Sequence, residues 1–217
     1  MVKKFRAELR SLKEDVRDMG DLALDMLQRA VKALETGDVS AVESFDRDKK
    51  RLADQDHEIE QDCLRLIALY QPVAKDLRTI ATALKMNTYL YRIGRYGKDI
   101  AILVPDLADV PESSDCLDSI PVMADLVIGM VTDALTAFER EDLSVIDDIL
   151  PREEEVDALR YDVLRESLAS MVDDPRRITW CTDCIMIARY LERCGDHACK
   201  IAEKVRYMVT GDRVEIR

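Results

Sequence analysis

The amino-acid sequence predicts an all-α protein built from two tandem three-helix bundles, with six long helices. Apolar residues recur every three or four positions along most of the 217 residues, which is the period of an amphipathic helix. Glycine and proline are scarce, with 7 and 6 residues, and aromatic residues make up 5%, which argues against a turn-rich β protein. The second half also repeats the pattern of the first, and this internal duplication predicts the division into two bundles.

Three helices are expected in the first half. The first covers about 3–36 and ends at Thr36-Gly37-Asp38, because glycine readily takes the left-handed conformation that closes a helix. The second covers about 39–69. It ends before Gln71-Pro72, since proline interrupts a helix interior and favours a first turn. The third helix then covers about 72–104.

A linker separates the two predicted repeats. Residues 105–116 have the composition of a loop, with two prolines, two adjacent serines and several acids. We therefore place the first repeat at 1–105, the linker at 106–117 and the second repeat at 118–217. In the second repeat, helices are expected at about 118–140, 142–170 and 174–209, with Gly211 after the last one.

The duplication is visible in the residues themselves. A shift of 104 positions aligns nine identical residues between 19–40 and the second half, where chance gives about one or two. Near the end of each half the shift becomes 101, and Leu90-Tyr91-Arg92-Ile93-Gly94 aligns with Leu191-Glu192-Arg193-Cys194-Gly195. The two halves therefore derive from one ancestral unit.

Charge and composition exclude several classes of partner. The formal net charge is −12 and the isoelectric point is about 4.7, so direct binding to nucleic acid or to an anionic membrane surface is disfavoured. No uninterrupted apolar stretch is long enough for a membrane span, and the basic start lacks the apolar core of a signal peptide. We expect a cytoplasmic protein with reduced cysteines, which reaches a membrane only through partner proteins.

Two pairs of acids in the second repeat form the candidate functional site. Glu192 and Asp196 are four residues apart, as are Glu153 and Asp157, and residues at this spacing share one helix face. If the two helices are antiparallel neighbours, the four carboxylates converge. Oxygen-only ligands suit hard cations such as Mg²⁺, Mn²⁺, Ca²⁺ or ferric iron.

Simpler interpretations of these acids remain open. Glu153 follows Pro151 and so belongs to the acidic first turn that the helix dipole favours. Glu192 has arginines at 189 and 193 with which it could pair on a solvated face.

Neither histidine nor cysteine adds a clear ligand. His197 lies about 140° around the helix from Glu192, which favours a surface or packing role. Cys181 and Cys199 lie on one predicted helix about 27 Å apart, so the cysteines at 181, 184, 194 and 199 cannot share one zinc ion. We expect most of them to be small core residues.

The combined motifs resemble those of the PhoU family of phosphate-uptake regulators. The first half contains LIALYQPVAKDLRTIATALK and YRIGRYGKDIA, and the second contains EEEVD and LERCGDHACKIAEKV. The resemblance covers essentially the whole chain. It implies two three-helix bundles with metal-binding E(D)xxxD motifs, which in some members hold multinuclear iron clusters. It further implies a regulator of the high-affinity phosphate ABC transporter and its signalling partners, with no catalysis of its own.

For this chain, the resemblance implies a metal site at Glu153, Asp157, Glu192 and Asp196. Iron is the first choice of metal, with manganese, magnesium or zinc as alternatives. The expected partners are phosphate ABC transporter subunits or a sensor kinase, and the expected assembly is a homodimer. Two other classes stay open, namely a carboxylate-bridged metalloenzyme and a metal-free helical adaptor, although no general base, nucleophile or glycine-rich loop supports an enzyme.

The first repeat departs from the family pattern. At the aligned positions it has Lys49, Ala53, Tyr91 and Arg95 in place of the four acids. We therefore expect this repeat to have lost its metal site. Either the positions have drifted, or the positive charges of Lys49 and Arg95 pair with nearby acids and replace the metal.

Overall fold

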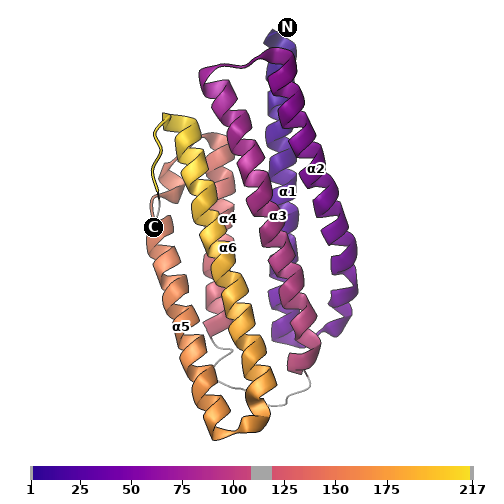
Figure 1. Ribbon diagram of the computed structural model, residues 1–217, viewed down its shortest axis with the longest axis vertical. Coiled ribbons are helices and arrows are strands. Elements are labelled where there is room, and N and C mark those ends of the chain that lie inside the picture. The colour runs from indigo at the N-terminus through magenta and orange to yellow at the C-terminus, as the bar shows by residue number, and fades with distance from the viewer. Residues whose placement is uncertain (1, 109–118, 216–217) are drawn as a thin grey trace.

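The computed structural model describes residues 2–108 and 119–215. Within this part of the chain six α-helices form two groups of three (Figure 1). The all-α prediction is confirmed. The helices are α1 (Val2–Thr36), α2 (Ser44–Tyr70), α3 (Ala74–Ala108), α4 (Ser119–Arg140), α5 (Ile149–Asp173) and α6 (Ile178–Thr210).

The two bundles lie side by side and share one continuous apolar core. Helices α1, α2 and α3 pack together, as do α4, α5 and α6. The main contact between the bundles is α3 against α6, with a smaller one between α1 and α4. Figure 1 shows α2 and α5 at opposite outer edges, and neither makes an extensive contact with the other bundle. Burial of apolar side chains therefore holds the three helices of each bundle together and also holds the two bundles against each other.

Among the described residues, only α4 is long and apolar enough to cross a membrane on length and composition alone. Half of its most apolar stretch is buried, and the helix contacts α1, α5 and α6. Its apolar character fits a helix at the centre of a bundle, which buries more than one face.

Three helices start at least four residues later than the sequence predicted, and one of them, α6, follows the 3₁₀ segment η4 (Pro175–Arg177). A short 3₁₀ segment, η1 (Val39–Glu43), precedes α2, and another, η3 (Ser144–Ile146), precedes α5. In each connection an aspartate accepts hydrogen bonds from the backbone N–H and the hydroxyl of a serine two residues later, Asp38 with Ser40 and Asp142 with Ser144. These local bonds stabilise a turn in competition with the α-helix.

The end of α3 also differs from its prediction. The helix continues past Pro105 to Ala108, so 106–108 belong to α3, while 109–118 lie outside the described residues. Proline lacks an N–H group, but in the last turn this removes only one hydrogen bond. Burial of Val104 and Leu107 offsets that loss.

Helices α1 and α3 approach each other closely at Gly97. A Cβ atom built on Gly97 would lie 2.9 Å from the backbone nitrogen of Leu27 and 2.9 Å from the carbonyl carbon of Met26. Because these are backbone atoms of α1, relief requires the two helices to separate. Around Gly195 in the second repeat, the nearest atoms would be at ordinary contact distances of 3.8 Å and above.

We expect Gly97→Ala to destabilise the protein by about 1–3 kcal/mol, the usual cost of overpacking a core. The matched change Gly195→Ala should be neutral or stabilising, because alanine is the better helix former and the added methyl group has room. Urea unfolding followed by circular dichroism measures both. Equal free energies of unfolding for the two variants would contradict the close approach.

Candidate functional site

The four predicted carboxylates lie on two neighbouring helices of the second bundle. Glu153 and Asp157 are on α5, Glu192 and Asp196 are on α6, and these helices pack against each other. Burial raises the pKa of Glu153, and the charges of Asp157, Asp196 and Glu192 raise it further. The carboxylates of the two helices are therefore close enough for their charges to raise the pKa of Glu153.

The site is less exposed than the sequence suggested. Glu192 is only 9% exposed, while Glu153, Asp157 and Asp196 are half-buried. Burial raises the pKa of Glu192, Asp196 adds to this, and Arg189 and Arg193 act in the opposite direction. The simpler interpretation, in which Glu192 pairs with arginines on a solvated face, is wrong about the solvation, because Glu192 is buried on a helix that contacts α3, α4 and α5.

Arginines of the same two helices form ion pairs with three of the carboxylates. Arg189 donates to Glu192 at 2.6 Å, and Arg193 donates to Asp196 at 3.1 Å. Arg160 Nε lies 3.7 Å from Asp157 Oδ1. Within the described residues, no three His, Cys, Asp or Glu side chains are arranged to hold a metal ion. A cation at this site would have to compete with these arginines.

One oxygen of Glu192 nevertheless fits a bound cation. Glu192 Oε2 is buried and accepts no hydrogen bond, with Arg193 Nε 3.9 Å away. A buried carboxylate oxygen without a donor is unfavourable, and either a metal ion or an ordered water would relieve it. The donor set, carboxylate oxygens alone, suits a hard cation.

The cysteines of α6 are buried, and none of the described cysteines forms a disulfide. Burial raises the pKa of Cys199 to about 12, so its thiol stays protonated and is a poor metal ligand. This agrees with the predicted core role.

His197 packs between the two bundles. It stacks on Tyr89 and Tyr96 of α3, with ring centroids 5.5 and 6.0 Å away, and Tyr96 also stacks on Tyr190. Burial lowers the pKa of His197 to about 4, so the ring is neutral at neutral pH. The spacing of Tyr89 and Tyr96, about two helical turns apart, is the sequence signal for this cluster.

The aligned positions of the first repeat carry no carboxylate. Arg95 is exposed and its Nη2 lies 3.9 Å from Asp99 Oδ2, a loose ion pair. Closer contacts occur nearby, where Lys98 of α3 pairs with Asp46 of α2, and Arg29 of α1 donates to Asp48 at 2.5 Å. Ion pairs therefore connect the helices of this repeat close to the place where the second repeat gathers acids.

Comparison with known proteins identifies relatives along the whole chain. The model of the PhoU domain matches residues 16–104 and 120–205. A phosphate-specific transport system accessory protein PhoU homolog of Caulobacter vibrioides is 36% identical over 213 residues, which cover 98% of this chain and 93% of that protein.

Two solved structures have the same fold. The crystal structure of PhoU from Pseudomonas aeruginosa superposes with a TM-score of 0.91 at 32% identity and covers 96% of this chain and 100% of that one. The phosphate transport system regulatory protein PhoU from Streptococcus pneumoniae superposes with a TM-score of 0.88 at 28% identity, covering 97% and 99%. The PhoU domain match over 120–205 spans the positions of all four carboxylates.

The raised pKa of Glu153 predicts a pH-dependent gain in stability for Glu153→Gln in metal-free protein. A carboxyl group whose pKa is higher in the folded state stabilises the fold at low pH, and this contribution is lost as the pH rises through the folded pKa. At pH 7 the variant should therefore melt about 1–3 °C above the wild type, and the gain should vanish below about pH 4. Glu155→Gln, at an exposed position of the same helix, is the control. A melting temperature at pH 7 equal to or below the wild type would contradict the assignment.

Proposed function

The chain belongs to the PhoU family of phosphate transport regulators, and on this premise we propose that it restrains phosphate uptake through metal-dependent contacts with transport proteins. It is a regulatory protein and not an enzyme, since its relatives are accessory and regulatory proteins of phosphate transport systems. The metalloenzyme alternative is therefore dropped.

The observation that carries the metal proposal is Glu192 Oε2, a buried carboxylate oxygen that accepts no hydrogen bond. The carboxylates of α5 and α6 also raise the pKa of Glu153 and Glu192, so negative charge accumulates here. Glu153, Asp157, Glu192 and Asp196 would hold the cation, with iron the first choice and manganese, magnesium or zinc as alternatives. When bound, the metal would supply positive charge that neutralises this acidic patch. The arginines now paired with the acids would be released toward solvent or toward a partner protein.

Apolar side chains on the outer helix α5 support a role in protein contact. Tyr161, Leu168 and Val172 are between 52% and 82% exposed, on a helix that contacts only its own bundle extensively. Exposed apolar groups of this kind favour protein interfaces. We propose that the protein is cytoplasmic, forms a homodimer, and binds the ATPase or permease subunit of a phosphate ABC transporter, or a sensor kinase.

The double variant Glu192→Gln/Asp196→Asn tests both parts of the proposal. Purified wild-type protein should contain a hard metal at about one equivalent or more per chain by elemental analysis, and the variant less than about a tenth of that. In cells whose own copy is deleted, the wild type should lower the rate of radiolabelled phosphate uptake and the variant should not.

Glu154→Gln/Glu155→Gln, which removes the same number of charges at exposed positions of α5, is the matched control. Absence of metal from the wild type after reconstitution would contradict the metal site. If the metal-free double variant still restrains uptake fully, the protein regulates uptake without a metal, and the metal-dependent part of the proposal is contradicted.

A further inference from the structure

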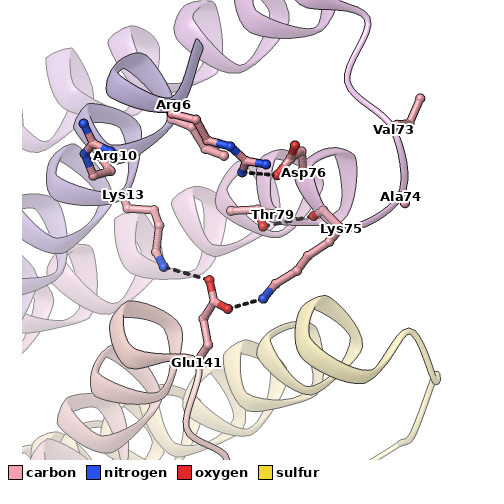
Figure 2. A pocket seen from close by; sticks show the side chains of 10 residues that line it. Arg6, Arg10, Lys13, Val73, Ala74, Lys75, Asp76, Thr79 and Glu141 are labelled. Carbon is pink, nitrogen blue, oxygen red and sulfur yellow. Dashed lines mark hydrogen bonds and ion pairs between the residues drawn. The ribbon is translucent and has the colours of Figure 1, made fainter. Parts of the chain in front are cut away.

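A cationic cavity lies outside the site formed by the four acids of α5 and α6, and none of those acids lines it. It has a volume of about 530 Å³ and is bounded by α1, the first turn of α3 and the residue that follows α4. Figure 2 shows its lining side chains, which include four bases and two acids: Arg6, Arg10, Lys13, Lys75, Asp76 and Glu141.

The bases outnumber the acids in this cavity. Arg6 donates to Asp76 at 2.6 Å, Lys13 donates to Glu141 at 3.4 Å, and Lys75 also pairs with Glu141. Arg10 forms no ion pair within the described residues. Four positive charges against two negative ones leave an excess of two, in a chain whose net charge is −12. The N-terminus of α3 adds its partial positive charge.

Glu141 occupies the cavity in the manner of a bound anion. Its carboxylate lies between Lys13 of α1 and Lys75 of α3, as Figure 2 shows. The hydrogen bond from Lys75 is the main reason that the pKa of Glu141 is low, and the charge of Lys13 contributes. The bases belong to the first repeat and Glu141 to the second, so this carboxylate also connects the two bundles.

The backbone shows that Glu141 stands where glycine is preferred. Its φ is 58°, in the left-handed region, and the residue at the aligned position of the first repeat is Gly37, with φ 65°. A non-glycine residue is unfavourable in this conformation. Glu141 therefore keeps an unfavourable backbone conformation, and its side chain places a carboxylate between Lys13 and Lys75.

We propose that this cavity binds a phosphate group, which displaces the carboxylate of Glu141 from Lys13 and Lys75. Once the carboxylate of Glu141 is displaced, four bases face a single acid, Asp76, and this excess of positive charge attracts a phosphate dianion. Arginine and lysine are the side chains that bind phosphate oxygens most strongly. The group could belong to inorganic phosphate or to a larger phosphorylated molecule, for which the cavity also has room. This site shares no residue with the proposed metal site, so a test of one site does not decide the other.

Calorimetric titration of the full chain tests the proposal, with inorganic phosphate and pyrophosphate as probes at constant ionic strength. The wild type should bind at least one probe saturably. Glu141→Gly should bind it about tenfold more tightly, since the competing carboxylate is gone and glycine suits the turn. Lys13→Gln/Lys75→Gln should bind it about tenfold more weakly or not at all. Lys32→Gln, which removes an exposed lysine on α1 that pairs with Glu35, is the control.

The two probes separate the sources of the phosphate group. Tighter binding of inorganic phosphate assigns the site to the free ion, and tighter binding of pyrophosphate assigns it to a larger phosphorylated molecule. Absence of saturable heat for both probes in the wild type and in Glu141→Gly would overturn the proposal. So would an affinity that the two lysine substitutions leave unchanged, provided that circular dichroism shows each variant to be folded.

Discussion

The packing of α3 against α6 is the contact on which the rest of the structure depends. Along it the two repeats share their core, and His197 of α6 is held between Tyr89 and Tyr96 of α3. Because α6 is thereby packed against three other helices, Glu192 is buried rather than solvated. The same contact fixes α3, whose first turn supplies Lys75 to the cationic cavity. The contact between the duplicated halves therefore positions both charged sites.

Duplication allowed the two halves to diverge in charge while keeping one backbone plan. The turns at Asp38 and Asp142 are nearly identical in hydrogen bonding, yet the residue before each is Gly37 in one and Glu141 in the other. The second repeat gathers carboxylates between α5 and α6, whereas the first connects its helices through ion pairs such as Lys98 with Asp46. Ion pairs connect the helices in the first half, and we propose that the second half keeps its acids for a metal.

Local sequence signals were sufficient for the fold but not for the details of the sites. Helical periodicity, Gly37, Gly211 and Gln71-Pro72 predicted the number of helices and most of their ends, because these signals act within a few residues. The continuation of α3 through Pro105 depends on buried neighbours that no local pattern shows. The spacing of the four acids predicted two pairs, which the structure places on neighbouring helices. Their pairing with Arg160, Arg189 and Arg193 depends on side-chain conformation, and the cationic cavity joins residues more than sixty positions apart.

We propose that a hard cation and Arg193 compete for the same carboxylates, since Arg193 contacts both Glu192 and Asp196. The most direct measurement is the metal affinity of Arg193→Gln beside that of the wild type, obtained by titration against a competing chelator. The exposed Arg165→Gln serves as the control for loss of one positive charge from the chain. We expect Arg193→Gln to bind the metal about tenfold more tightly than the wild type or Arg165→Gln does. An affinity equal to or weaker than that of the wild type would contradict it.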